Sequence, residues 1–521
     1  MTDWSNEFDV ILRNGRIVDG TGNPWYYGDV GIRGERIEAV DNLEKAQAPR
    51  VIDATNKVVC PGFIDVHVHS EFGILTGEET EARIRQGITS DLLAPDGLSY
   101  SPLSDQRLAE MKQYLAIFYG VPDVGWDWNT QEEYQDKYDR KVAMNVVPQV
   151  AFNSVRAEVV GWDPRPATPD ELERMKEITR EVMEAGATGI QTGLEYYPSA
   201  HATTEELIEV SKVVAEYGGV YSSHIRGYGE NFKTSSEEVF TIAEQAGIPV
   251  HFSHLTGRPE FYEPLEAARK RGLDITFESY PYMAGCTHLV YCFPSWAQSG
   301  TPDEIIARLK TKEARDRLRP EIDHFFLDRE FSLNDIVFAS LATDSNRHLA
   351  GMKFGKALEE SGKDLTDFTC DLLVEENLRV LMVFHWDDEL RLRTALTHPY
   401  QMVGSDGVFQ KGFPHPRGYG TYPKILGHYV RERGWLTLED AIRRMSSYPA
   451  SRYLLRDRGI VRLGMAADVV VFDPETIIDR ATYENGMQYS EGVEYVFVNG
   501  ELVLDDSKMT SALPGRVLKA R

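Results

Sequence analysis

Eight apolar, strand-like runs alternate with helix-like segments through the middle of this 521-residue chain, which predicts an α/β fold, a TIM-type (β/α)8 barrel. Two further observations extend this prediction. Both ends of the chain carry short strand–turn–strand patterns, which predict one small β-sandwich domain formed by the two termini together. A segment at about 283–399 separates the last two runs and is too long for a simple crossover, so we expect a helical insertion there.

The two ends are each too short to form a large core alone. "FDVILRNGRIVDGTG" near the start and "VEYVFVNGELVL" near the end hold Val and Ile runs divided by Asn-Gly or Asp-Gly turn signals. We therefore expect residues 1–60 and 456–521 to pair into the small β domain. Residues 61–455 are left for the barrel and its insertion.

The barrel strands are expected where apolar runs end at turn residues: 58–68, 88–93, 142–152, 186–193, 219–225, 248–255, 273–280 and 401–405. Several intervening segments open with helix start signals. In "TPDELERMKEITREVMEAG", Thr168 is expected to cap a helix, Glu171 completes a capping box, and Gly186 marks the stop. The segment that starts at Thr203 repeats this pattern.

Composition narrows the class of protein. Hydrophobic residues make up 42% of the chain and charged residues 26%, which is ordinary for a globular protein. The formal net charge of -26 argues against nucleic acid or an anionic membrane as the main partner. No apolar stretch is long enough for a membrane span, and the N-terminus resembles no secretory signal. We expect a cytoplasmic protein that acts on a small molecule, with a homo-oligomer possible.

"GFIDVHVHSE" places His67 and His69 two residues apart at the end of the first barrel run. Side chains at i and i+2 of a strand point to the same face, so both rings would enter the barrel at the end where barrel enzymes hold their active sites. A single histidine there is more often an ordinary hydrogen-bonded side chain. A same-face pair favours a metal site.

Three more polar residues end later barrel runs. His224 in "YSSHIRG" ends the fifth run, His254 in "HFSHLTG" the sixth, and Asp406 in "MVGSDG" the eighth. Together with the first pair they supply four imidazoles and a carboxylate, which suit zinc or a similar divalent ion.

The remaining histidines are expected to be structural or exposed. His251 lies three residues before His254, so we expect it to face the helix layer. His288, His385 and His415 lie in predicted loops or in the insertion, where we expect a solvated surface position, with contact to the substrate as the alternative.

"VVCPGFIDVHVHSE" resembles the amidohydrolase superfamily, and the chain is similar nearly end to end to its D-aminoacylase, or N-acyl-D-amino-acid deacylase, branch. "QGITS", "ATTEELIEVSKVVAEYGGVYSSHIRGYGE" and the long segment that begins "MVGSDGVFQKGFPHPRGYGT" carry this similarity. The resemblance implies a zinc-dependent enzyme with one or two divalent ions per subunit that hydrolyses a linear amide, most simply an N-acyl-D-amino acid. It also implies that Asp406 is both a metal ligand and the catalytic residue.

The residue that bridges the metals departs from the pattern. Many members of the superfamily use a carboxylated Lys on strand 4, but "GATGIQTGLEYYP" contains none. The D-aminoacylase branch has a Cys after strand 2, where this chain has Asp96. Because a carboxylate can bind two ions through its two oxygens, we expect Asp96 to bridge them, with Glu195 as the alternative. Asp96 in "PDG" is also an ordinary turn residue.

The resemblance further implies a mechanism. A divalent ion lowers the pKa of a bound water to about 7 and polarises the scissile carbonyl. Asp406 would accept the proton of that water and return it to the leaving amine.

Substrate contacts are implied less directly. Arg417 in "HPRGYGT" matches an Arg that binds the substrate carboxylate in the family, although a structural Arg that holds loops together is equally compatible. We expect the substrate pocket to include Tyr196, Tyr197, Tyr282 and Glu195, for which simple packing is the alternative.

The family often has a Lys shortly after the strand-6 His, where this chain has Thr256, so the substrate could differ from a simple N-acyl-D-amino acid. The alternatives are a cyclic-amide or other amide hydrolase of the superfamily and a catalytically inactive binding protein. The last of these predicts a broken ligand set.

Overall fold

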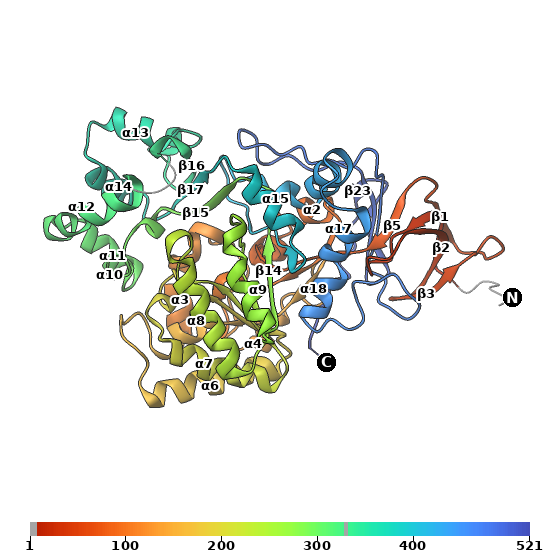
Figure 1. The fold of residues 1–521 in the computed structure, drawn as a ribbon, viewed down its shortest axis with the longest axis horizontal. Helices are drawn as coiled ribbons and strands as arrows, with labels where there is room; N and C mark the ends of the chain where they lie inside the picture. The colour runs from red at the N-terminus through yellow and green to blue at the C-terminus, as the bar shows by residue number, and fades with distance from the viewer. Residues whose placement is uncertain (1–7, 328–331, 521) are drawn as a thin grey trace.

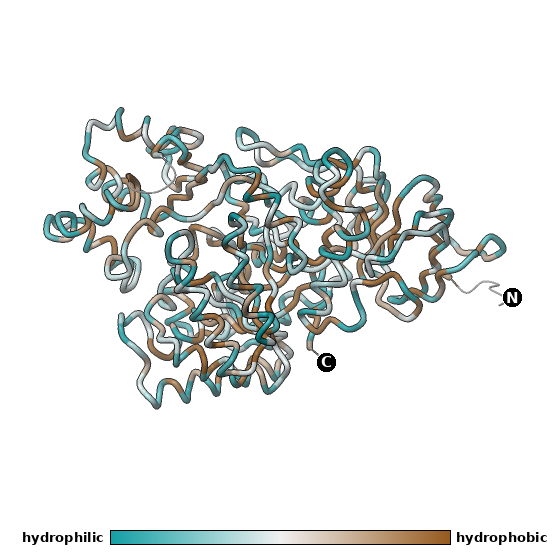
Figure 2. The backbone as a smooth tube through the Cα atoms, viewed as in Figure 1, coloured by the Kyte–Doolittle hydropathy of each residue, from teal (hydrophilic) through white to brown (hydrophobic). Residues whose placement is uncertain are grey.

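The computed structural model describes residues 8–327 and 332–520, and its fold is mixed α/β. Figure 1 shows parallel strands and helices in the centre, strands from both termini at one end, and a unit that contains α12, α13 and α14 at the other. Figure 2 shows hydrophobic residues along the strands and hydrophilic residues on the outer turns. Within the described residues, none of the helices combines the length and apolar composition that crossing a membrane requires.

The central strands run parallel and follow the predicted runs. One sheet pairs β6 (Phe63–Asp65), β8 (Ile88–Leu92) and β9 (Asn145–Val147). A second sheet pairs in order β10 (Val150–Ala151), β11 (Gly189–Gly193), β12 (Val220–His224), β13 (Val250–Phe252), β14 (Ile275–Ser279) and β18 (Gln401–Val403). In addition, β19 (Gly407–Val408) pairs parallel with β7 (Val68–His69), so the last run lies beside the first. Each of the eight predicted runs contains one or more of these strands.

Helices between these strands begin where the sequence predicts. In α6 (Pro169–Glu184), the Thr168 Oγ1 accepts the N–H of Glu171 at 3.3 Å, and the Glu171 carboxylate accepts the N–H of Thr168 at 2.8 Å. The helix α7 (Thr204–Glu216) opens with the same capping box at Thr203. Such caps contribute about 1 kcal/mol each. Further helices of this layer are α8 (Phe232–Ala246) and α9 (Glu263–Lys270).

Strands from both termini share one sheet. In the described part of the chain it is nine-stranded, with the order β23-β22-β21-β20-β5-β1-β2-β3 and β4 beside β1. Its N-terminal strands are β1 (Val10–Ile17), β2 (Tyr26–Arg33), β3 (Arg36–Asp41), β4 (Arg50–Asp53) and β5 (Val58–Pro61). Its C-terminal strands are β20 (Val469–Phe472), β21 (Val493–Val498), β22 (Glu501–Asp505) and β23 (Lys508–Met509). The antiparallel pair of β5 with β20 joins the two ends of the chain, as their strand patterns predict.

The described part of the segment between β14 and β18 is mainly helical, as the sequence predicts, and it also contains strands that the sequence did not indicate. Its helices include α11 (Pro302–Leu309), α12 (Lys312–Leu327), α13 (Phe354–Ser361) and α14 (Leu365–Glu375). They pack beside a three-stranded antiparallel sheet of β15 (Ala284–His288), β17 (Val380–His385) and β16 (Ile336–Leu341). Apolar runs of about six residues fit a buried strand or a buried helix equally well, so periodicity could not distinguish the two.

Candidate metal centre

The structure brings the six predicted metal ligands together at the carboxyl ends of the parallel strands. Each lies at or just after a strand end: His67 between β6 and β7, His69 at the end of β7, Asp96 after β8, His224 at the end of β12, His254 after β13, and Asp406 between β18 and β19. Their convergence follows from parallel pairing, because the carboxyl ends of neighbouring parallel strands lie at one edge.

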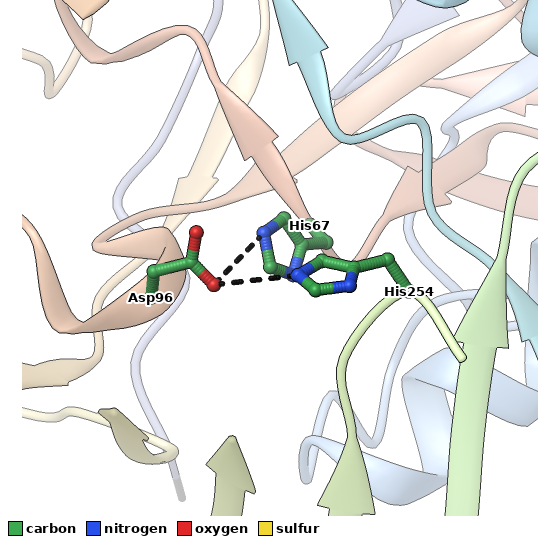
Figure 3. A group of neighbouring side chains, drawn as sticks. All are labelled: His67, Asp96 and His254. Atoms are coloured by element: carbon green, nitrogen blue, oxygen red, sulfur yellow. Dashed lines mark ion pairs between the residues drawn. The ribbon is translucent and has the colours of Figure 1, made fainter. Parts of the chain in front are cut away.

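Asp96 lies in the middle of this cluster, with its two oxygens directed at different histidines. Its Oδ1 is 3.4 Å from His67 Nε2 and 3.8 Å from His254 Nε2, as Figure 3 shows. The same oxygen is 3.9 Å from His224 Nδ1, whereas Oδ2 is 3.6 Å from His69 Nε2. Two ligand atoms of one tetrahedral zinc ion lie roughly 3.3 Å apart. The observed spacings are close to this value.

Asp406 completes a second group. Its Oδ1 is 3.8 Å from His67 Nε2 and 3.6 Å from His69 Nε2. Two overlapping sets of possible ligands result, one of His67, His69 and Asp406, the other of His67, Asp96 and His254. His224 Nδ1 extends the second set, because it lies 3.0 Å from His254 Nε2.

The unsatisfied atoms of the cluster fit a divalent cation. Among the described residues, the buried atoms His67 Nε2 and Asp96 Oδ1 have no hydrogen-bond partner. A buried polar atom without a hydrogen-bond partner lowers the stability of the folded state by about 1–3 kcal/mol. A cation between the imidazoles and the carboxylates would satisfy both atoms. Imidazole nitrogens and carboxylate oxygens are ligands that zinc accepts.

Both carboxylates are ionised in this environment. Burial acts to raise the pKa of Asp96, but the neighbouring His67 and His254 hold it well below its usual range. Burial opposes ionisation of Asp406 as well, and the guanidinium of Arg417 together with His69 holds its pKa far below the ordinary value. The cluster therefore presents two anionic ligands to a cation.

The histidines of the first strand are oriented through their second ring nitrogen. His67 Nδ1 lies 2.9 Å from Glu278 Oε1, and His69 Nδ1 lies 3.3 Å from Tyr119 Oη. Such partners fix the tautomer and the orientation of metal-binding imidazoles. Both Nε2 atoms are thereby left to face Asp96 and Asp406.

Glu195 contacts the ring nitrogen of His224 that points away from Asp96, as Glu278 does for His67. Its carboxylate oxygen lies 2.8 Å from His224 Nε2 and accepts the hydroxyl of Tyr291 at 2.8 Å. His224 directs its other nitrogen, Nδ1, towards Asp96. This geometry does not support the alternative in which Glu195 is the bridging ligand.

Glu278, which lies in β14 and is fully buried, was not among the residues predicted from the sequence. Besides its contact with His67, it accepts the N–H of His254 at 2.7 Å and contacts His251 Nε2. Burial acts to raise the pKa of Glu278, but His251 and His67 lower it to about 2. The available signal was a lone Glu inside the apolar run "ITFES", since an acidic residue is almost never fully buried without partners.

The prediction that His251 faces the helix layer was wrong. His251 Nδ1 lies 2.7 Å from Thr276 Oγ1, and its Nε2 contacts Glu278 beneath the cluster. The strand β13 ends at Phe252, and His254 has a φ of 36°, in the left-handed region. The turn returns His254 to the side that His251 already faces, which a strict two-residue alternation does not allow.

Arg417, the first residue of α16 (Arg417–Lys424), is buried beside the cluster. Its Nη1 is 2.8 Å from Asp406 Oδ2, and its Nη2 donates to the carbonyl of Cys286 at 3.2 Å. The guanidinium carbon also lies 4.7 Å from the centre of the Tyr280 ring. This Arg therefore connects Asp406 to the strand β15.

The expectation of solvated histidines was wrong for His288 and His415, which are 3% and 1% exposed. His415 Nε2 donates to the Ala284 carbonyl at 3.0 Å, and its Nδ1 accepts the N–H of Arg417 at 3.1 Å. His385 is half-buried, with its ring 4.6 Å from that of Tyr483. Packing of the insertion against the chain buries these side chains, and local sequence carries no signal for such packing.

The predicted tyrosines divide into two groups. The Tyr196 ring lies 4.8 Å from the His224 ring, whereas the Tyr282 hydroxyl is buried beside Gly420 and Asp479 and has no hydrogen-bond partner among the described residues. Tyr197 instead stacks on Trp162 at 5.8 Å and donates its hydroxyl to the Trp162 carbonyl. The structure therefore places Tyr197 in packing, not in the site.

A cavity of about 480 Å³ adjoins the cluster. Its lining includes Glu195, Leu194, Arg226, Tyr291, Phe293 and Phe325. Glu195 lines this cavity and contacts His224, so the cavity lies behind that histidine.

Comparisons with known proteins agree with this geometry. The model of the Amidohydrolase family matches residues 50–312 and 347–504. D-aminoacylase of Alcaligenes xylosoxydans xylosoxydans is 32% identical over 99% of this chain and 98% of its own length. A crystal structure of a D-aminoacylase, described as defining a novel subset of amidohydrolases, covers 98% of this chain and 100% of its own with 32% identity and a TM-score of 0.82.

A second solved structure is that of N-acyl-D-glutamate deacylase from Bordetella bronchiseptica, complexed with zinc and a phosphonate inhibitor that mimics the tetrahedral intermediate of the reaction. It is 29% identical, covers 99% of this chain and 100% of its own, and has a TM-score of 0.83. These findings confirm the resemblance that the sequence motifs carry. The chain belongs to the amidohydrolase family.

Proposed function

We propose that this chain is a zinc-dependent hydrolase that cleaves the amide bond of an N-acyl-D-amino acid or a similar N-acyl compound. The observation that carries the proposal is the buried cluster in which Asp96 Oδ1 faces His67, His224 and His254 while Oδ2 faces His69. The names of the full-length relatives supply the substrate class.

The architecture that we propose is a closed (β/α)8 barrel with a β-sandwich domain. The pairing of β7 with β19 supports closure, because it brings the first and last parallel runs together. The sandwich is supported by one hydrophobic cluster in which Val30 and Ile52 from the N-terminal strands pack with Val471 and Phe497 from the C-terminal strands. We place the domain boundaries at 1–60, 61–455 and 456–521.

We propose binding sites for two divalent metal ions, with the carboxylate of Asp96 as the ligand that bridges them. His67, His69 and Asp406 would hold one ion, and His224 and His254 the other. A bound zinc ion supplies a Lewis acid that polarises the scissile carbonyl and acidifies water.

Asp406 is the proposed proton carrier. Its ionised carboxylate accepts a proton from the attacking water as the water oxygen bonds to the carbonyl carbon. The same carboxyl group then donates that proton to the amine nitrogen as the carbon–nitrogen bond breaks. The products are a carboxylate and a free amine.

Substrate orientation is assigned to Arg417 and Tyr282. Arg417 Nε and Tyr282 Oη are both buried and have no hydrogen-bond partner in the described part of the chain. Donors of this kind match a carboxylate acceptor. Tyr196 and Glu195 are proposed to border the same pocket.

The alternative of an inactive binding protein predicts a broken ligand set, but all six predicted ligands lie together. The second candidate function is hydrolysis of a cyclic amide, or of another amide, by the same metal centre. The cytoplasmic location and a homo-oligomeric assembly stay predictions.

The direct test is amine release from matched N-acetyl-D- and N-acetyl-L-amino acids by zinc-loaded protein. We expect turnover of the D series and little of the L series. If neither enantiomer reacts while zinc is bound, the substrate assignment is wrong although the metal centre stands.

A further inference from the structure

We propose that Glu71 is a positioning residue that holds the Asp96 loop, residues 94–99, at the place where its carboxylate can reach both groups of histidines. This inference rests on the metal centre of the proposed function, and it assigns a role to a buried acid that takes no part in the proposed reaction. Glu71 is the first residue of α1 (Glu71–Thr76) and follows His69 by two positions.

The Asp96 loop has a backbone that needs support from outside. Ala94 and Asp96 have φ values of 60° and 56°, in the left-handed region that residues with a Cβ avoid. Residues in this conformation are strained, and the conformation persists only where the surroundings impose it. Local sequence preference alone therefore does not hold Asp96 in place.

Glu71 contacts both ends of the loop with one carboxylate. Its Oε1 accepts the N–H of Ala94 at 2.7 Å, and its Oε2 accepts the hydroxyl of Ser99 at 3.0 Å. A third donor, the Tyr134 hydroxyl, lies 2.7 Å from Oε2 and outside the loop. The Glu71 side chain is fully buried, so water does not replace these bonds.

A second side of the loop is in close contact with β11. A Cβ added to Gly193 would lie 2.5 Å from the Asp96 carbonyl oxygen and 3.0 Å from Asp96 Cβ. A Cβ added to Gly97 would lie 2.6 Å from the Gln191 carbonyl oxygen. The backbones are already as close as glycine permits, so the loop cannot move towards β11. Glu71 holds the loop through Ala94 and Ser99, and the Ser154 hydroxyl donates to the Ser99 carbonyl at 2.6 Å as well.

Small movements matter here because metal–ligand distances tolerate only ~0.2 Å. Asp96 is a short side chain, and its two oxygens face four histidines from three of the parallel runs. A shift of the loop would lengthen the contacts of one oxygen whichever way the side chain rotated. Loss of Glu71 should therefore weaken metal binding through Asp96.

The test is zinc affinity of metal-free protein, measured by competition with a chromophoric chelator, together with zinc content after dialysis. Glu71→Met keeps the size of the side chain and removes its acceptors. We expect ~10–100-fold weaker zinc binding, the usual effect of losing an outer partner of a metal ligand. In an Asp96→Ala background the same change should have no further effect, because Asp96 is then absent.

Milder variants keep the proposal testable if Glu71→Met fails to fold. Ser99→Ala removes one bond to the loop and should weaken zinc binding about fivefold, whereas Tyr134→Phe removes the donor outside the loop and should leave zinc affinity unchanged.

Equal losses in Ser99→Ala and Tyr134→Phe, or a Glu71→Met loss that persists in the Asp96→Ala background, would overturn the role of Glu71. Wild-type protein that binds no zinc would instead overturn the proposed function.

Discussion

Arg417 and Asp406 form a buried ion pair, with Nη1 of the guanidinium 2.8 Å from Oδ2 of the carboxylate. Asp406 turns its other oxygen, Oδ1, towards His67 and His69. The proposed proton carrier is therefore shared between the metal centre and the residue that we assign to the substrate carboxylate. This arrangement connects recognition of the substrate with the group that performs the chemistry.

Replacement of Arg417 by Met tests whether this residue binds the substrate carboxylate. Loss of a hydrogen-bonded charge costs about 1.5–3 kcal/mol, so kcat/KM for an N-acyl-D-amino acid should fall by about 10–100-fold. The fall should be much smaller for an N-acyl amine that lacks the carboxylate. Arg417→Lys, which keeps the charge, is the matched control. Equal losses for both substrates would show that Arg417 acts through its ion pair with Asp406 or through the fold, and not on the substrate carboxylate.

Replacement of Asp406 by Asn should stop proton transfer and leave the fold intact. The amide cannot accept the proton, and positioned acid–base groups contribute about 10²–10⁴-fold to the rate, so kcat should fall by that factor. Steady-state kinetics and zinc content measured on the same preparation check this. Asp344→Asn, at a carboxylate 86% exposed, is the control and should behave as wild type. Retention of kcat in Asp406→Asn would remove this residue from the mechanism.

Replacement of Asp96 should change the number of zinc ions bound. Asp96→Ala removes both bridging oxygens, so we expect one fewer tightly held ion per chain by elemental analysis after dialysis. Asp96→Cys supplies a thiolate, a zinc ligand, and should restore part of the lost content. Unchanged zinc content in Asp96→Ala would show that the turn position of this residue, and not its carboxylate, explains its burial.

His288 carries a prediction about pH. Burial and the nearby His224 lower the pKa of His288 to about 3. The unfolded chain therefore takes up this proton near pH 6.5 while the folded chain does not. The stability associated with the neutral ring is fully present above about pH 6.5 and is lost as the pH falls towards 3.

His288→Asn should therefore lose less stability than wild type on acidification. Between pH 7 and pH 5 the difference should reach about 2 kcal/mol in the free energy of unfolding. Denaturant unfolding of metal-free protein at the two pH values measures it. His348→Asn, at an exposed histidine, should follow wild type. Parallel curves for His288→Asn and wild type would contradict the prediction.

Much of the fold and the ligands could be predicted from local sequence. Periodicity and turn residues located the eight parallel runs, and the capping box at Thr168 located the start of α6. The spacing of His67 and His69 placed them on one face. These features depend on neighbours in the chain, and for such features local physical chemistry decides the outcome.

Contacts across the fold could not be predicted in this way. The carboxylate of Glu278 joins His67 to His254, residues that are separated by 187 positions in the chain. His251 and His254 reach the same side only because the backbone turns left-handed at His254. The strands of the insertion and the burial of His415 likewise depend on packing partners from elsewhere in the chain.

The sequence by itself determined which residue types stand at the strand ends, and hence the family and the proposed set of metal ligands. Only the tertiary structure decided where the three carboxylates lie. Asp96 lies inside the cluster, whereas Glu195 and Glu278 contact the outer ring nitrogens of its histidines. The physical reason is that a carboxylate acts through its distance from other groups. Those distances are set by parallel strands that meet from distant parts of the chain.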